Sequence, residues 1–167
     1  ETKHVLTTFR ESYDMIAEMW NVCNNFLHVM CVDSQYKPVE YKGIRFEEEK
    51  AWTQEGMYIS LPGLHRTSDG SFKYKADQMQ DRWIYGSQLF NFLCQHTARN
   101  IVYHQINKVA EHYKPLMAVH DETTIIIPDK EVDVAKKTLM EIFRTPPDWC
   151  QDLPLDAEID IGQYYSK

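Results

Sequence analysis

The stretch from Leu116 to Ile127 constrains the fold more than any other part of the chain. Two runs of strand-forming residues flank His120, Asp121 and Glu122, and no Asn-Gly or Asp-Gly pair that would favour a tight turn lies between them. We expect a hairpin whose turn is held by tertiary context, and local backbone strain of that kind clusters at functional sites. The hairpin would carry a carboxylate at its tip, where it could meet a metal ion. The alternative is a polar loop between two ordinary strands.

Composition indicates one folded domain. The chain has 167 residues, of which 43% are hydrophobic, enough for a real core. Its net charge of -7 lacks the basic surplus of a free-standing nucleic-acid binder. Either the chain does not bind nucleic acid, or the basic surface lies on another part of a larger assembly.

The four cysteines are widely spread and form no Cys-x-x-Cys pair, which argues against a zinc knuckle and favours reduced thiols in the cytoplasm. The sequence has no apolar run of membrane-spanning length and no visible signal peptide, so no membrane partner is expected. Because the first residue is Glu, we expect a fragment, a processed product or the ordered part of a longer polypeptide.

Helical periodicity marks three segments. At residues 7–30, apolar side chains recur at steps of four and three on one face, which predicts a long amphipathic helix. A second long helix is predicted from Gly86 to about Tyr113, with apolar residues over much of its circumference. A third is predicted to begin at Pro128-Asp129 and to end at Pro146-Pro147.

Short strands are predicted between and after these helices. From Val32 to Asp81, Pro and Gly separate short alternating segments, which predicts antiparallel strands and loops. The tail at residues 153–162 also alternates and is predicted to be a strand. The expected order is helix, small strands, long helix, hairpin, helix and strand. This order predicts an α+β fold, in which helices pack on an antiparallel sheet.

A polar stripe follows one face of the second helix. Gln88, Asn91, Gln95 and Arg99 succeed one another at steps of three, four and four. They form either a solvent-facing edge or a row of amides and a guanidinium directed at a polar ligand. Asn and Gln suit the groove edges of bases, because each carries a donor and an acceptor.

Taken together, these segments carry a family resemblance. The run Val119–Glu122, followed by an apolar strand, Pro128, a helix and a closing strand, resembles the third signature motif of family A DNA polymerases. Residues 85–99, with their Tyr-Gly, Gln, Asn and Arg, resemble the long palm helix that precedes that motif, most closely in phage-type members. Residues 161–167 are similar to the family's C-terminus, and residues 8–20 to the helix that follows the fingers.

The resemblance covers nearly the whole chain and implies an antiparallel palm sheet with long packed helices. It implies a helix following the fingers (residues 1–30), short strands and loops (residues 31–81) and a palm core with the Asp121 hairpin (residues 82–167). The chain departs from the family at Leu61–Arg66, where a Pro-Ser-Gly-Arg turn is usual. It also departs at Phe92, where phage-type members often carry Asn.

The activity implied by the resemblance is template-directed DNA synthesis by a two-metal mechanism, with primer–template DNA and a deoxynucleoside triphosphate as partners. Asp121 is the implied ligand of two Mg²⁺ ions, and Glu122 is implied to act beside it. His120 is implied to contact the primer terminus.

The resemblance also assigns the stripe. Asn91 and Gln95 are implied to touch the minor-groove side of the nascent pair, whose acceptors recur in every correct pair. Arg99 is implied either to support the packing of the helix on the hairpin or to contact a phosphate.

Two family motifs are missing from this sequence. They are the first palm motif, which supplies the other metal-binding Asp, and the fingers helix, which grips the incoming nucleotide. We therefore expect the isolated chain to be inactive and to need an N-terminal polymerase portion, in the same polypeptide or in a separate chain. The expected location is the cytoplasm, that of a bacterial host if the chain is phage-encoded.

Two rival functions remain open from the sequence. The chain could be a non-catalytic structural or assembly subunit of a split polymerase. It could also be a metal-dependent phosphohydrolase that uses His120 and Asp121. His96, His104 and His112, which recur at steps of eight, would be available as further ligands.

Overall fold

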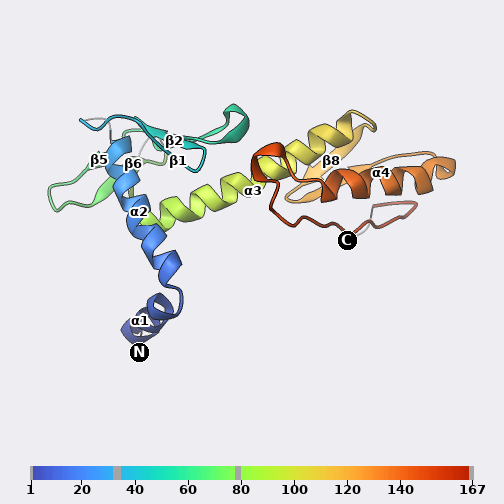
Figure 1. Cartoon of the computed structure of the whole chain (residues 1–167). Helices are drawn as coiled ribbons and strands as arrows, with labels where there is room; N and C mark the ends of the chain where they lie inside the picture. Colours follow the sequence, from blue (N-terminus) through green and yellow to red (C-terminus); the bar gives the residue numbers. More distant parts are fainter. Residues whose placement is uncertain (1, 32–34, 78–79, 166–167) are drawn as a thin grey trace. The chain divides into compact units, whose positions relative to one another are not determined.

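The computed structural model describes residues 2–31, 35–77 and 80–165, so Val32, Ser166 and Lys167 of the predicted segments lie outside it. The chain divides into two compact units, Glu1–Thr97 and Ala98–Lys167. One helix, α3 (Gly86–Ala110), contributes residues to both, as Figure 1 shows in green and yellow.

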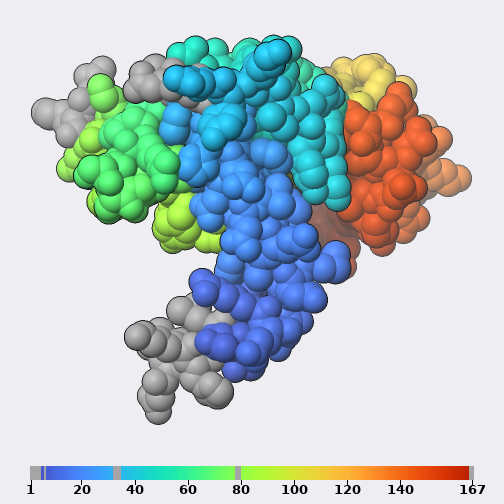
Figure 2. Space-filling model, turned by 60° about the vertical axis from the view of Figure 1, so that its left-hand side comes forward, coloured from blue at the N-terminus to red at the C-terminus, as the bar shows by residue number. Residues whose placement is uncertain are grey.

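The predicted first helix is in fact two helices, α1 (Thr2–Ser12) and α2 (Asp14–Met30). Tyr13 separates them with φ -130° and ψ 57°, so the single helix predicted at residues 7–30 is wrong. The break lets the ring of Phe9 stack on Trp20, with centroids 5.8 Å apart. A continuous helix would hold these residues about 16 Å apart along its axis. In Figure 2, α1 stands clear of the sheets of its own unit.

The first unit also contains two antiparallel sheets, which confirm the predicted short strands. The first sheet has the order β1–β2–β3–β4 and the second the order β5–β6–β7. Their bounds are β1 (Val39–Tyr41), β2 (Ile44–Glu47), β3 (Lys50–Trp52), β4 (Tyr58–Ser60), β5 (His65–Arg66), β6 (Phe72–Lys75) and β7 (Asp81–Ile84). A short 3-10 turn, η1 (Gln54–Gly56), joins β3 to β4.

The core of this unit lies between α2, the sheets and the start of α3. Phe26 of α2 stacks on Phe46 of β2, with ring centroids 3.9 Å apart. Leu27, Met30, Leu61, Leu64 and Leu89 are fully or almost fully buried in the same cluster. The apolar face predicted for α2 therefore packs as a core face, because its residues at steps of three and four point toward the sheets.

The start of α3 approaches α2 closely at Gly86. The backbone N–H of Gly86 donates a hydrogen bond to the Asn24 side-chain oxygen at 2.6 Å. A Cβ at position 86 would lie 1.9 Å from the carbonyl oxygen of Trp20, so only glycine fits. The absence of a side chain at this position sets how near the two helices come.

The second unit holds the end of α3, the hairpin and a helix. The hairpin consists of β8 (Pro115–Val119) and β9 (Glu122–Ile125). After a 3-10 turn, η2 (Asp129–Glu131), α4 (Val132–Arg144) follows, and a last 3-10 turn is η3 (Asp148–Cys150). These elements confirm the predicted second and third helices, with α3 ending at Ala110.

Gln105 links α3 to α4 inside the second unit. Its side-chain nitrogen donates to the carbonyl oxygen of Phe143 at 2.9 Å. This oxygen is one of the last four carbonyls of α4, which have no partner within their own helix. This hydrogen bond therefore gives a partner both to the buried side-chain nitrogen of Gln105 and to a carbonyl at the end of α4.

The predicted strand at residues 153–162 is wrong, because this segment joins no sheet. Its alternation is nevertheless real: Leu155, Ala157 and Ile159 are half-buried, and the acidic residues between them are exposed. Arg144 at the end of α4 holds the segment through an ion pair with Asp156, with Nε 2.8 Å from Oδ1. Alternation of apolar and polar residues shows which side chains face the protein. It does not show whether another strand is present to form backbone hydrogen bonds.

The arrangement of antiparallel sheets and helices confirms the predicted α+β class. The described strands form three separate sheets, of four, three and two strands. None of the helices in the described residues combines the length and the apolar character needed to cross a membrane.

Candidate active site

The hairpin predicted around His120 is present and has a two-residue tip. Val119 of β8 pairs with Glu122 of β9, which leaves His120 and Asp121 as the turn. His120 has a φ of 55°, in the left-handed region that side-chain-bearing residues rarely adopt. A turn without glycine is therefore formed at the cost of local strain, as expected from the sequence.

The carboxylate of Asp121 lies at the exposed end of this hairpin. His120 and Asp121 are exposed and Glu122 is half-buried. A carboxylate is the kind of hard oxygen ligand that Mg²⁺ prefers. The tip thus offers one exposed carboxylate, with a second carboxylate next to it in the chain.

A complete metal site is not formed by the residues that the structure describes. They contain no group of three or more His, Cys, Asp or Glu side chains that could hold an ion. Mg²⁺ usually keeps several waters and binds proteins through one or two carboxylates. Asp121 fits as one such ligand, and two adjacent ions would need a further carboxylate from another polypeptide segment.

The polar stripe on α3 faces solvent over most of its length. Asn91, Gln95 and Arg99 are exposed, whereas Gln88 is half-buried. The side-chain nitrogen of Gln95 lies 3.5 Å from the side-chain oxygen of Asn91, so the two amides form a pair. In the chain by itself, Asn91, Gln95 and Arg99 therefore form a solvent-facing edge.

Arg99 is held in place by its neighbour on the next turn. Its Nε and Nη2 donate to the hydroxyl of Tyr103 at 3.2 and 2.8 Å. The guanidinium also lies 5.1 Å from the centroid of that ring. This fixes the side chain and leaves the remaining N–H groups of the guanidinium for a ligand.

The structure gathers the predicted site residues into two groups. Asn91 and Gln95 belong to the first unit, and Arg99, His120, Asp121 and Glu122 to the second. The groups that the structure assembles locally are the amide pair on α3 and the carboxylate tip of the hairpin.

The three histidines considered as alternative ligands do not form a metal centre. His96, His104 and His112 all lie on or just after α3, and no described metal cluster includes them. Their spacing of eight residues is not a multiple of the helical repeat, so the side chains turn progressively around the axis.

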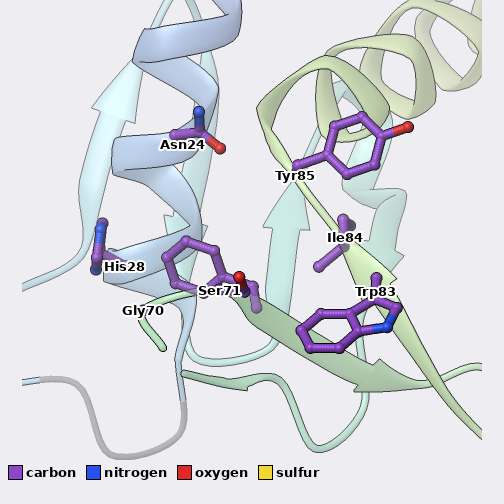
Figure 3. A pocket seen from close by; sticks show the side chains of 8 residues that line it. Asn24, His28, Gly70, Ser71, Trp83, Ile84 and Tyr85 are labelled. Carbon is purple, nitrogen blue, oxygen red and sulfur yellow. The ribbon is translucent and has the colours of Figure 1, made fainter. Parts of the chain in front are cut away.

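A cavity of about 510 Å³ opens in the first unit, between α2 and the β6–β7 sheet. Figure 3 shows Asn24 and His28 on one side and Trp83, Ile84 and Tyr85 on the other. The residues that line it are Asn24, His28, Gly70, Ser71, Phe72, Trp83, Ile84 and Tyr85.

His28 forms an aromatic wall of this cavity. Its ring packs edge-on against Phe72, with centroids 4.7 Å apart. Burial lowers the pKa of His28 below its ordinary value, and the positive charge of the nearby Arg66 lowers the pKa further. Both effects disfavour the protonated form of the imidazole.

The sequence did not point to this cavity. Its residues come from α2, from β6 and the turn before it, and from the end of β7 and the residue that follows it. The available signals were the step of four from Asn24 to His28 and the aromatic pair at Trp83 and Tyr85, and each is common in ordinary helices and strands.

Comparison with known proteins does not extend these observations. No protein-family model, curated protein or solved structure matches this chain.

Proposed function

We propose that this chain is the C-terminal palm portion of a family A DNA polymerase and supplies half of a two-metal site for template-directed DNA synthesis. The observation that carries the proposal is the hairpin tip, where His120 and Asp121 form a strained two-residue turn that exposes a carboxylate. A strained turn with an exposed metal ligand is typical of a functional site. The resemblance of the surrounding sequence to the family supplies the choice of reaction.

The proposal assigns a role to each residue of the tip. Asp121 holds a Mg²⁺ ion, Glu122 supports it from the adjacent position, and His120 contacts the primer terminus. The bound ions would activate the primer 3′ hydroxyl and stabilise the leaving pyrophosphate. The protein's part is to present the carboxylate at the exposed end of the hairpin.

The amide pair on α3 is assigned to the nascent base pair. Asn91 and Gln95 are exposed and lie one turn apart, so both can offer donors to acceptors in a minor groove. Such acceptors recur in all correct pairs, so these contacts test the shape of a pair without reading its sequence. Arg99, fixed by Tyr103, contacts a phosphate or supports packing beside the site.

The proposal requires an N-terminal portion that carries the first palm motif and the fingers. The hairpin is compatible with such a partner, because β8 and β9 pair only with each other among the described strands. Leu116 and Ile126 of the hairpin region are 63% and 75% exposed. A two-stranded sheet is marginally stable alone and is stabilised by a further strand or by covering its apolar side chains.

Primer extension tests this proposal. The tagged chain is purified recombinantly by itself, and also from its native cells with the polypeptide bound to it. We expect no extension by the isolated chain with Mg²⁺, and extension by the native assembly. In that assembly, Asp121→Ala should lower the rate at least about 10²- to 10³-fold, because an electrostatic group of the transition state is lost.

The matched control is Asp152→Ala, which removes an exposed carboxylate from the same unit. It should extend primers like the unchanged protein. Normal extension by Asp121→Ala, or a native assembly that does not extend primers, would overturn the proposed function. Extension by the isolated chain would overturn the requirement for a partner.

A further inference from the structure

The cavity beside α2 is walled by aromatic rings that are available to a ligand. Trp83 and Tyr85 are 51% and 53% exposed, so about half of each side chain remains open to solvent. His28, which Figure 3 shows on the opposite side from Trp83, and Phe72, whose ring packs on His28, add two further aromatic rings to the lining. The volume of about 510 Å³ lies within the range of sites that bind small ligands or single nucleotides.

Two cations, Lys73 and Arg66, lie beside residues that line this cavity. The ammonium of Lys73 lies 4.2 Å from the centroid of the Trp83 ring. The Nε of Arg66 lies 3.4 Å from the carbonyl oxygen of Gly70, a lining residue, and the charge of Arg66 acts on His28. An aromatic ring with a cation beside it can take both halves of a nucleotide, the base by stacking and the phosphate by charge.

The sheet behind these residues is locally basic in a chain of net charge -7. Its strands carry Arg66, Lys73, Lys75 and Arg82 against the single acid Asp81. The nearest acid in the turn before β6 is Asp69, which accepts hydrogen bonds from the Thr67 hydroxyl and the Ser71 N–H. These hydrogen bonds lower the pKa of Asp69, so its negative charge remains and is held by the turn's own donors.

We propose that the cavity binds an unpaired nucleotide of single-stranded DNA, with the base stacked on Trp83 and the phosphates held by Arg66 and Lys73. Half-exposed rings beside cations on adjacent strands suit a continuous strand, because base stacking combined with backbone charge is how single strands are held without sequence preference. The choice of DNA over RNA rests on the proposed function. The stacking site itself does not, because none of its residues belongs to the Asp121 hairpin.

Fluorescence anisotropy of a labelled oligothymidylate of about 12 nucleotides tests this site on the whole chain. We expect Trp83→Ala to weaken binding about tenfold, as for the loss of one stacked base, and Trp83→Phe to restore most of it. The matched control is Tyr58→Ala, which removes another exposed aromatic ring with a lysine, Lys50, 5.1 Å from its centroid. It should bind like the unchanged chain.

The contribution of charge is measured separately. In Arg66→Gln, the slope of log affinity against log salt should fall by about 0.7, the value for one phosphate contact on a single strand. Because Arg66 is exposed, this variant keeps the test decisive if Trp83→Ala does not fold.

Three results would overturn the inference. They are no binding by the unchanged chain at low salt, equal weakening by Trp83→Ala and Tyr58→Ala, or competition by free thymidine monophosphate at the same concentration per nucleotide. Much tighter binding of oligouridylate would overturn the choice of DNA. The assay measures binding and not extension, and Asp152→Ala should bind the oligonucleotide normally, so failure of this site and failure of the proposed polymerase role are separable.

Discussion

His120 is the residue at which backbone strain and proposed function meet. Its φ of 55° costs a side-chain-bearing residue about 1 kcal/mol relative to glycine. The sequence indicated a turn lacking glycine, but only the structure identifies which residue adopts the left-handed conformation. Lys42, Glu49 and Glu55 adopt the same backbone region in other turns of the chain.

His120→Gly should therefore raise the free energy of unfolding by about 0.5 kcal/mol, since relief of strain exceeds the added entropy of the unfolded chain. Chemical denaturation measures this change. In the native assembly, the same variant should slow primer extension. Lys42→Gly, at another positive φ of 49°, should stabilise similarly and leave extension unchanged. Equal extension by both glycine variants would contradict the role of His120.

His28 should make stability depend on pH. Folding lowers the pKa of His28 below its ordinary value of about 6.5. At a pH below about 6.5, the unfolded chain therefore binds a proton at His28 more readily than the folded chain does. The stabilising contribution is complete above that value and is lost as the pH falls toward the folded pKa. Denaturation between about pH 7.5 and 5 should show a smaller loss of stability for His28→Gln than for the unchanged chain. Identical curves would contradict this assignment.

At the scale of elements, the close approach of α2 and α3 depends on Gly86. Its missing side chain allows the N–H of Gly86 to reach the Asn24 oxygen at 2.6 Å. The sequence placed the start of the helix at Gly86 correctly. It did not indicate which surface would lie against this glycine, because that contact joins residues more than sixty positions apart.

Gly86→Ala should lower the free energy of unfolding by about 3 kcal/mol, because its Cβ would meet the Trp20 carbonyl and the backbone must shift. Gly56→Ala is the matched control, with a φ of 73° and no atom within 4 Å of an added Cβ. Its conformational cost should be about 1 kcal/mol. Denaturant titration of both variants compares the steric cost with the conformational one. Equal losses would show that α2 and α3 can separate without penalty.

Element boundaries show where periodicity is insufficient. Apolar spacing predicted helix over residues 7–30, yet the chain breaks at Tyr13, where neither Gly nor Pro signals a stop. The same kind of pattern predicted a strand in the tail, whose alternation is real but lacks a partner backbone. In both cases the pattern correctly predicted which side chains face the protein. It did not predict the contacts with other segments that decide where the element ends or whether it joins a sheet.

At the scale of the whole molecule, the chain supplies only part of the metal chemistry proposed for it. Asp121 and Glu122 are adjacent in sequence, and the described residues contain no cluster that would complete a site. The proposed activity therefore belongs to an assembly, and the isolated chain should behave as a folded protein with weak affinity for divalent ions.

Magnesium should consequently stabilise the isolated chain very little. If one carboxylate binds Mg²⁺ with a dissociation constant of about 10 mM, an equal concentration of the ion adds about 0.4 kcal/mol. Thermal denaturation with and without Mg²⁺ measures this contribution, and Asp121→Asn should remove it. A much larger stabilisation that disappears in Asp121→Asn would show that this chain holds a complete site by itself.

The sequence by itself determined α3, α4, the short strands of the first unit and the hairpin with its carboxylate, because periodicity and turn chemistry act between residues close in the chain. The tertiary structure decided where α1 and α2 separate, that the tail joins no sheet, and that His28 and Trp83 line one cavity. These features depend on packing between distant residues. Such contacts leave no local period in the sequence. The contacts of α2 with β6 and β7 form the cavity that is the second candidate binding site.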